Sequence, residues 1–409
     1  MTGTTPRHTR SVQLNQPSGR TFMNESDAPP KAGLSRRRML GGAVAGTLGV
    51  AAATALPLGG GSARFGAAGT ARAQQDAPSE TYRIDLHSHV LPPDYRASLL
   101  SHGHFTIGGY PTPEWSPESA LEFMDYYGIQ AQALSVSDPG VGFLPPGKEA
   151  NDMARYCNDY VAGLTKQHPT RFGSFAVLPM PDIAASVAEA IYALDVLHAD
   201  GIILLSAYNG VYLGDPAFEP LMIALNDRKA YVFVHPAAIP DDAKPNLPLP
   251  DFLEEFTFDT TRAATMMMLT GVTQRYSNIR FQLSHAGGTL PFLSWRVGVA
   301  SETAIGKNWP EGLGKPSLLD TKTQISRFFY DTALSASNAA MSAVTAVTSR
   351  DHIVFGSDWP FSATTLPQTG THDPAPGLSD IFDADQRMEV EHHAPLRQLP
   401  RLAAAINTR

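Results

Sequence analysis

From residue 81 onward, short runs of apolar residues alternate with longer segments in which apolar residues recur every three or four positions. The short runs are rich in β-branched and aromatic residues, and most are continuously apolar. Continuous apolar runs are typical of parallel strands that are covered on both faces. We therefore predict eight strands, at residues 83–87, 131–137, 171–178, 201–206, 231–235, 278–285, 327–332 and 352–358.

The longer segments predict helices that follow these strands. Their ranges are 118–127, 150–168, 186–198, 218–228, 259–276, 290–303 and 338–348. Strands and helices that alternate in this way predict an α/β fold, a (β/α)8 TIM barrel, over residues 81–405. The three methionines at 266–268 then belong to a helix that packs against the sheet. Residues 360–386 are predicted to form a long loop, and residues 387–409 a closing helix interrupted at Pro395 and Pro400.

The first 73 residues have the pattern of an export leader. Arginines at 36–38 precede an apolar, glycine-rich run at 41–58, and Ala-Arg-Ala at 71–73 resembles a cleavage site. Adjacent arginines at this position are typical of twin-arginine signals, although Met39 stands where that signal usually has phenylalanine. Met23 would give a leader of ordinary length. The alternatives are a membrane anchor, for which the run is weakly apolar, or a cytoplasmic protein without a leader.

Removal of this leader changes the charge balance of the chain. Residues 1–73 hold nine Lys or Arg and two Asp or Glu, so the remainder carries 22 basic against 37 acidic residues. This acidity argues against nucleic acid as a partner. The chain has one cysteine, Cys157, which excludes an intramolecular disulfide and a cysteine-rich zinc site. The absence of disulfides suits a protein that folds before export.

Histidines and an aspartate stand at the ends of four predicted strands. His87 and His89 end the first strand, His235 the fifth, His285 the sixth and Asp358 the eighth. Residues i and i+2 of a strand point the same way, so two imidazoles of His-x-His can converge on a metal. The pair alone would be expected by chance among 13 histidines, but the other strand ends of a TIM barrel meet at the same rim.

The remaining histidines fall in the leader, in helices or in loops, and we interpret them as solvated or capping side chains. His102 and His104 are the exceptions, since they lie in a loop after the first strand that could cover the rim.

The motifs DLHSH, VFVHP, LSHAGG and FGSDWPF, in this order, resemble the amidohydrolase superfamily. More narrowly, they resemble its decarboxylating branch, which includes aminocarboxymuconate-semialdehyde decarboxylase. Segments such as RFGSFAVLPMPD and YDTALSAS look most similar to the 6-methylsalicylate decarboxylase group. The resemblance covers residues 82–405 and implies a TIM barrel of the metal-dependent hydrolase type.

The resemblance implies that His87, His89, His235 and Asp358 bind a metal, with His285 as a nearby acid–base residue. Three imidazoles and one carboxylate suit Zn²⁺, with Mn²⁺ as the alternative. Binuclear relatives use a carboxylated lysine near the end of the fourth strand. Residues 201–208 contain no lysine, so we expect one divalent ion.

The activity implied is the non-oxidative decarboxylation of a small aromatic or enoic acid, such as a hydroxybenzoate of the 6-methylsalicylate type. A proton from Asp358, His285 or water would reach the carbon that bears the carboxylate, and carbon dioxide would leave. Arg262 is a candidate contact for the carboxylate, or else a surface or capping residue. Trp359 and Phe361 are candidates to line an aromatic pocket, or else pack the last loop.

Two other functions remain open at this point. The same residues could direct water at an ester, lactone or amide, which would make the protein a mononuclear hydrolase. The chain could also be an exported metal-binding barrel without activity. We expect a small carboxylic acid as partner, no membrane span in the mature chain and, by analogy alone, a homodimer.

Overall fold

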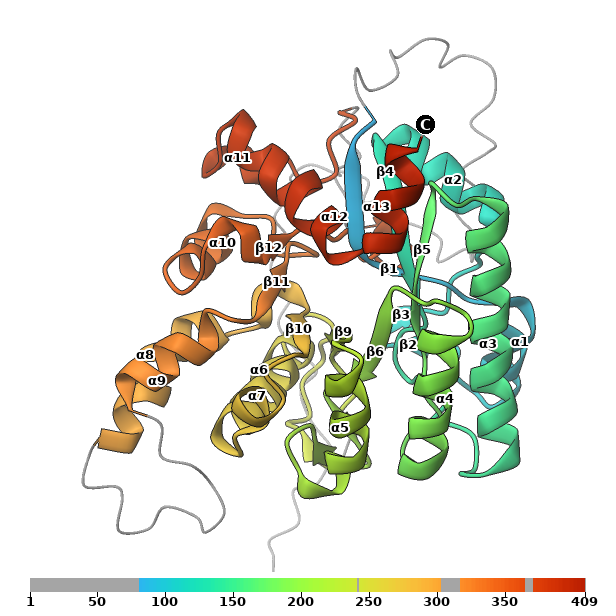
Figure 1. The fold of residues 1–409 in the computed structure, drawn as a ribbon, viewed down its shortest axis with the longest axis horizontal. Coiled ribbons are helices and arrows are strands. Elements are labelled where there is room, and N and C mark those ends of the chain that lie inside the picture. The colour runs from blue at the N-terminus through green and yellow to red at the C-terminus, as the bar shows by residue number, and fades with distance from the viewer. Residues whose placement is uncertain (1–80, 241–242, 303–316, 365–370, 409) are drawn as a thin grey trace, which may run out of the picture. The chain divides into compact units, whose positions relative to one another are not determined.

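The computed structural model describes residues 81–240, 243–302, 317–364 and 371–408 (Figure 1). The leader predicted at residues 1–73 lies outside these ranges. Within them, no helix is both long and apolar enough to span a membrane.

Eight parallel strands form a nearly closed barrel, which confirms the predicted fold class (Figure 1). Hydrogen bonds continue from the last strand to the first, because the Leu86 amide bonds the Phe355 carbonyl and Ser88 bridges Trp359. In barrel order the strands are β1 (Arg83–His89), β4 (Ile129–Ser135), β5 (Phe172–Ala176), β6 (Gly201–Leu205), β9 (Tyr231–His235), β10 (Arg280–Leu283), β11 (Phe329–Asp331) and β12 (Ile353–Val354).

Helices surround the barrel and cover the outer face of its strands (Figure 1). Those predicted from the sequence are α2 (Pro117–Tyr126), α3 (Lys148–Gln167), α4 (Ile183–Asp195), α5 (Glu219–Asp227), α6 (Glu255–Leu269), α7 (Val272–Arg275), α8 (Leu290–Glu302) and α10 (Asn338–Thr345). The predicted helix at 259–276 is in fact two helices, since Gly271 lies between them with φ of 77°. Met267 and Met268 are buried against the core, as predicted.

Several elements carry no clear periodicity and were not predicted. They are α1 (Pro93–Ser101), α9 (Leu318–Ile325), the hairpin β2–β3 (Thr106–Ile107 and Tyr110–Pro111) and the hairpin β7–β8 (Ala207–Tyr208 and Val211–Tyr212). The two hairpins follow strands β1 and β6, and so belong to the loops at the carboxyl rim. That rim is where TIM barrels carry their chemistry.

The carboxyl-terminal segment covers the opposite, amino-terminal end of the barrel. It comprises α11 (Ala384–Met388), a π-helical turn (Glu389–His393), α12 (Ala394–Gln398) and α13 (Pro400–Asn407). The predicted interruption at Pro395 is wrong, because this proline is the second residue of α12, which continues the π-helical turn without a break. The predicted break at Pro400 is confirmed, since α13 begins there after Leu399 leaves helical geometry.

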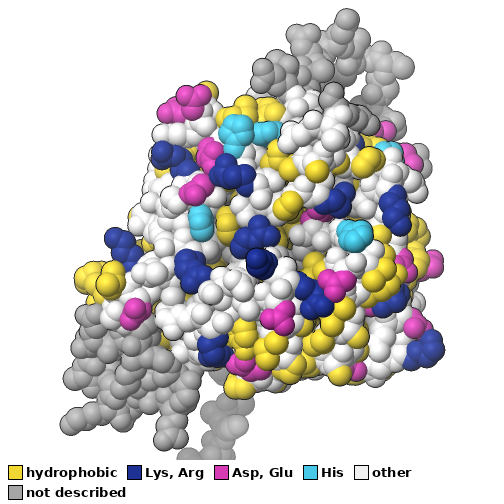
Figure 2. Space-filling model, viewed as in Figure 1, with side chains coloured by type: hydrophobic (Ala, Val, Ile, Leu, Met, Phe, Trp, Pro, Cys, Tyr) yellow, Lys and Arg dark blue, Asp and Glu magenta, His cyan; other side chains and the backbone are white. Residues whose placement is uncertain are grey.

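Ion pairs attach this segment to the strands. Arg401 bonds Asp200 and the Phe172 carbonyl, at the starts of β6 and β5. Glu391, which is fully buried, accepts hydrogen bonds from Arg83 and Tyr82 at the start of β1. Acidic and basic side chains are interspersed on the face seen in Figure 2. The amino-terminal end is thus closed by structural contacts, which leaves the carboxyl rim for function.

Candidate metal centre and active site

Four side chains from three barrel strands converge at the carboxyl rim. They are His87 and His89 of β1, His235 of β9, and Asp358, which follows β12. One ligand atom from each lies within 4.8 Å of the other three, and all four residues are buried. The distance to Asp358 Oδ1 is 3.3 Å from His87 Nε2 and 3.1 Å from His89 Nε2. Among the described residues, this is the cluster whose donor atoms could hold a metal ion.

Hydrogen bonds fix the tautomer of each imidazole. Nδ1 of His235 lies 2.8 Å from the Pro236 carbonyl, and Nδ1 of His87 lies 2.8 Å from a carboxylate oxygen of Asp331. These oxygens can only accept, so both Nδ1 atoms donate. Nδ1 of His89 lies 3.1 Å from Ser135 Oγ, whose own proton goes to the Ser88 carbonyl, so this Nδ1 donates as well. In the neutral form of each ring, Nε2 therefore carries the lone pair.

The donor set fits a divalent metal. The Nε2 atoms of His87 and His89 are buried and make no hydrogen bond. Buried polar atoms are almost always satisfied, so two such atoms beside a carboxylate indicate that a ligand completes the site. Burial lowers the pKa of His89 and His235, which keeps both imidazoles neutral and able to coordinate.

Charge acts differently on the other two members of the cluster. Burial opposes protonation of His87, but the neighbouring Asp331 and Asp358 raise its pKa to about 10. Burial also disfavours the Asp358 anion, but the charge of His87 and the contacts of the neighbouring histidines hold the pKa of Asp358 well below its usual range. These opposite charges favour a protonated His87 beside an ionised Asp358. Metal binding would displace the proton.

The backbone around the cluster is strained. Asp358, His285, Ala286 and Leu334 all have positive φ, between 49° and 59°, although none is glycine. L-residues rarely adopt this conformation, which costs about 1 kcal/mol or more each, and such residues concentrate at functional sites. Here the conformation turns Asp358 toward the histidines of β1, four residues after the end of β12.

His285 lies beside the cluster, within the short turn that follows β10. Its Nε2 atom is 3.5 Å from Asp358 Oδ2, and its ring centroid is 5.0 Å from that of His87. Both ring nitrogens are buried without a hydrogen bond. His285 is thus close enough to act on a ligand at the cluster, and neither nitrogen is occupied by the protein.

Asp331 is a residue of this site that the sequence analysis missed. It ends β11 and is fully buried. One carboxylate oxygen accepts from His87 Nδ1 at 2.8 Å and from Gln282 Nε2 at 3.0 Å, while the other accepts from the His285 amide at 2.8 Å. Asp331 therefore orients a cluster histidine and the adjacent His285 together. Its position at the end of the seventh predicted strand was the available signal.

Replacing Asp331 by asparagine should weaken metal binding about 10- to 100-fold, because such outer partners fix the orientation of ligating histidines. The new side chain would keep the size of the old one but could offer its amide nitrogen to His87 instead of an oxygen. Competition with a chelator measures the change in metal affinity. Asp227→Asn, at an exposed position on α5, is the matched control. Equal affinity in Asp331→Asn and wild type would contradict the role of Asp331.

A pocket opens above the cluster. His235 and Asp358 form its floor, and its walls come from five segments that follow β1, β4, β9, β11 and β12. The remaining lining residues are Ile107, Tyr110, Ser137, Phe252, Phe256, Leu334 and Phe361. Phe361 packs edge-on against His89, with 5.5 Å between ring centroids. The structure thus brings Phe361 to the pocket, where the sequence analysis expected it.

Trp359 and Arg262 do not line this pocket. Trp359 is buried and stacks on Phe123, with ring centroids 5.2 Å apart, so its indole belongs to the packing of the last loop. Arg262 is exposed on α6, where its charge lies near the Tyr212 hydroxyl and opposes the rise in the pKa of that group. Both positions match the structural alternative considered for each residue. Two further aromatic residues, Phe258 and Trp295, are exposed and do not line the pocket either.

The loop that follows His235 is held by two buried carboxylates. Asp259 accepts from the Ala237 amide at 3.0 Å and from Tyr212, and Asp138 accepts from the Ala238 amide at 3.1 Å. These contacts fix the loop whose Pro236 carbonyl orients His235. Burial raises the pKa of Asp138 to about 7, and the charges of Asp259 and Asp251 add to this effect.

Replacing Asp138 by asparagine should therefore stabilise the protein at neutral and alkaline pH. Below about pH 4 this carboxyl is protonated in both the folded and the unfolded protein, so it costs no stability. Between about pH 4 and 7 the unfolded protein ionises first, and the free energy of unfolding falls as the pH rises. The variant escapes this loss, on the order of 4 kcal/mol at most. Urea unfolding at pH 4, 6 and 8 should show a gain that grows with pH. A gain independent of pH would contradict the assignment.

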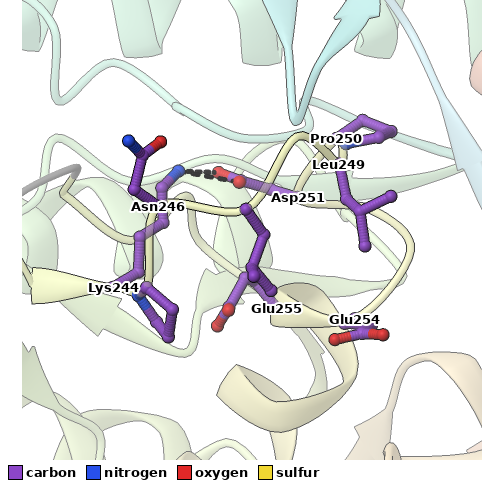
Figure 3. A pocket seen from close by; sticks show the side chains of 9 residues that line it. Lys244, Asn246, Leu249, Pro250, Asp251, Glu254 and Glu255 are labelled. Carbon is purple, nitrogen blue, oxygen red and sulfur yellow. Dashed lines mark hydrogen bonds and ion pairs between the residues drawn. The ribbon is translucent and has the colours of Figure 1, made fainter.

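A larger hollow of the described surface lies elsewhere. It measures about 470 Å³ and is formed by residues 244–255 (Figure 3). Lys244 bonds both carboxylate oxygens of Asp251 there, at 2.7 and 2.8 Å. None of its lining residues belongs to the metal cluster. The segment nevertheless bears on the site, because its Phe252 faces the pocket over the cluster.

Comparison with known proteins decides the family. The family model described as amidohydrolase matches residues 84–399. The chain belongs to the amidohydrolase family. The resemblance deduced from the sequence motifs is thereby confirmed.

The relatives of this amidohydrolase include decarboxylases. It is 38% identical to decarboxylase yanB of Aspergillus niger, over 68% of this chain and 77% of that one. It is 35% identical to the 6-methylsalicylic acid decarboxylase acuB of Aspergillus aculeatus, over 68% and 84%. These relatives confirm the resemblance to the decarboxylating branch.

A solved structure shares the fold. It is 5-carboxyvanillate decarboxylase of Novosphingobium aromaticivorans, in complex with manganese and 4-hydroxy-3-methoxy-5-nitrobenzoic acid. The TM-score is 0.67 at 18% identity, covering 78% of this chain and 96% of that one. At this identity the similarity establishes the barrel fold.

Proposed function

We propose that this amidohydrolase is a metal-dependent, non-oxidative decarboxylase of hydroxybenzoate-like acids. The observation that carries the proposal is the buried cluster of three histidines and Asp358 beneath a pocket with aromatic walls. Relatives named as decarboxylases favour decarboxylation over the hydrolysis of an ester, lactone or amide. A flat aromatic acid suits a pocket lined by Tyr110, Phe252, Phe256 and Phe361.

His87, His89, His235 and Asp358 would hold one divalent ion. When bound, that ion would polarise the oxygen atoms of the substrate and stabilise developing negative charge. Three imidazole nitrogens favour Zn²⁺, whereas a related fold carries manganese, so both ions are candidates. Metal analysis of the protein purified without added metal, followed by reconstitution with each ion, distinguishes them. Activity with neither ion would contradict this part of the proposal.

In the reaction, the ring carbon that bears the carboxylate gains a proton. The bond to the carboxylate then breaks, its electron pair returns to the ring, and carbon dioxide leaves. His285 is our candidate for the proton donor, because both of its ring nitrogens are free of hydrogen bonds and Nε2 faces Asp358. Asp358 would orient His285 through this contact, and Phe361 would hold the ring.

The decisive experiment measures carbon dioxide release from a panel of hydroxybenzoates, with an ester and lactone panel assayed in parallel. The metal-loaded full chain should release carbon dioxide stoichiometrically with loss of the acid. Hydrolysis of a lactone or ester without carbon dioxide release would overturn decarboxylation in favour of the hydrolase. Inactivity of the loaded protein on both panels would favour a non-enzymatic barrel.

We further propose that residues 1–73 direct export by the twin-arginine route. The support lies in Arg36 to Arg38, the apolar run and the Ala-Arg-Ala site. Replacing Arg36 to Arg38 by lysine should keep the protein in the cytoplasm if the route is correct. Unchanged distribution between cell fractions would contradict it.

A homodimer is proposed by analogy alone. Light scattering of the purified chain measures its mass directly. A single mass near 44 kDa for the full chain would contradict the dimer.

A further inference from the structure

The pocket over the metal cluster has a roof built from two segments far apart in sequence. One is the hairpin β2–β3, and the other is the segment that leads into α6. They are joined by a hydrogen bond of 3.1 Å from the Phe252 amide to the Gly108 carbonyl. A side chain at Gly108 would collide with the Phe256 ring at 2.5 Å, so glycine allows the two segments to touch.

Three of the side chains that this roof turns toward the cluster are wholly apolar, and the fourth, Tyr110, adds a hydroxyl. Ile107 of the hairpin and Phe256 of α6 are both buried and line the pocket together with Phe252. Phe256 packs edge-on against His235, with 6.0 Å between ring centroids, so the apolar roof reaches the cluster itself. On its outer side, the same segment carries the Lys244–Asp251 ion pair (Figure 3). These two charged side chains therefore line the hollow of Figure 3 and not the pocket over the cluster.

The space between roof and floor is small. It holds about 20 Å³, roughly the room for one water molecule. A benzoate ring must therefore press the walls apart and will contact all of them. A group on the ring that does not face the floor must then lie against Ile107, Phe252 or Phe256, or against the Tyr110–Phe361 pair.

We propose that this roof selects hydroxybenzoates whose remaining ring substituent is apolar, such as a methyl group, and that Ile107, Phe252 and Phe256 determine the choice. The inference rests on the proposed function and specifies its substrate class. A hydroxyl placed against these three side chains would lose its hydrogen bonds to water without replacement. A methyl group would gain from the same burial.

Two hydroxyls in the lining provide the counterargument. Ser137 and Tyr110 each bring one to the pocket, and neither makes a side-chain hydrogen bond to another described residue. Either could accept a phenolic proton and so favour a polar substituent. The preference for methyl or hydroxyl therefore depends on whether the substituent contacts Ile107, Phe252 and Phe256 or contacts these hydroxyls, and the variants below distinguish the two.

A matched pair of substrates tests the inference. 6-Methylsalicylate and 2,6-dihydroxybenzoate differ only in a methyl or a hydroxyl at one ring position, and these groups have similar size. For the metal-loaded wild-type chain, we expect kcat/KM at least about tenfold higher for the methyl acid, the range found for single apolar groups in pockets. Equal values, or a preference for the dihydroxy acid, would overturn the inference.

Variants at Ile107 and Tyr110 test which residue is responsible for the preference between methyl and hydroxyl. Ile107→Thr places a hydroxyl in the roof and shortens the side chain by one carbon, and should lower the methyl-to-hydroxyl ratio several-fold or more. Ile107→Val shortens the side chain without adding a hydroxyl and should keep the preference for methyl. Ile223→Thr, at a half-exposed position on α5, should leave the ratio unchanged. An unchanged ratio in a folded Ile107→Thr would remove this residue from the roof's role. Tyr110→Phe should leave the preference for methyl intact, and its loss in that variant would assign the choice to Tyr110.

Binding separates this inference from the proposed function. Calorimetric titration of the metal-loaded chain with each acid gives affinities that need no turnover. Tighter binding of 6-methylsalicylate without carbon dioxide release would refute the decarboxylase and leave the selectivity standing. Release at equal rates from both acids would support the decarboxylase and refute the selectivity. Binding of neither acid would overturn the inference.

Discussion

Replacing His235 by alanine is expected to remove the metal and lower carbon dioxide release at least about 1,000-fold. The expectation follows because polarisation by a metal contributes several kcal/mol, and each 1.4 kcal/mol is a factor of ten in rate. His235 supplies one of four donors, and its Nδ1 is already used by Pro236, so the remaining three cannot close the site. Metal content by mass spectrometry and the initial rate of release measure both effects.

Two variants make this first result interpretable. Asp358→Asn keeps the volume of the side chain and removes its charge, so it should lose metal without leaving a cavity. His393→Ala, an exposed histidine at the amino-terminal end of the barrel, should retain full metal content and full rate. Retention of one metal per chain in both His235→Ala and Asp358→Asn would refute the assigned cluster.

Replacing His285 by asparagine is the second large effect we expect, and it should separate catalysis from metal binding. The residue stands beside the cluster but is not part of it, so the metal content should stay near one per chain. The loss of a positioned proton donor should lower kcat about 100- to 10,000-fold. KM should change less, because Phe361 and the roof contact the substrate independently of His285.

The comparison needs a histidine that is chemically similar but remote from the cluster. His102→Asn serves, because its imidazole is exposed and bonds only its own helix end. If His285→Asn loses the metal together with activity, His285 is a ligand rather than a proton donor. If kcat is unchanged, the donor is Asp358 or water.

The barrel was largely predictable because most of its strands are short, mainly apolar runs, a local property of the chain. Parallel strands that are covered on both faces need no distant information to be recognised. The elements that were not predicted depend on contacts with residues far away in the sequence. The hairpin β2–β3 has two residues per strand, and Gly108 is explained only by Phe256, which lies far along the chain.

The candidate site divides in the same way. His87, His89, His235, His285 and Asp358 could be grouped from the sequence, because strand ends of a barrel share one rim and the motifs resemble a family. Arg262 was a reasonable candidate by chemistry, yet its side chain is exposed on α6 away from the pocket. Helical phase decides this placement, and a phase error of one residue turns a side chain by about 100°.

By itself, the sequence determined the barrel, the family and the residues able to bind a metal, since these depend on local periodicity and on side-chain type. Only the tertiary structure decided which partners tune those residues. Asp331 reaches His87 and His285 from a different strand, and Ser135 sets the tautomer of His89 from another. The apolar roof likewise exists only where the hairpin and the start of α6 meet. Such contacts join residues that are far apart in the sequence, and local sequence patterns do not show which distant residues will meet.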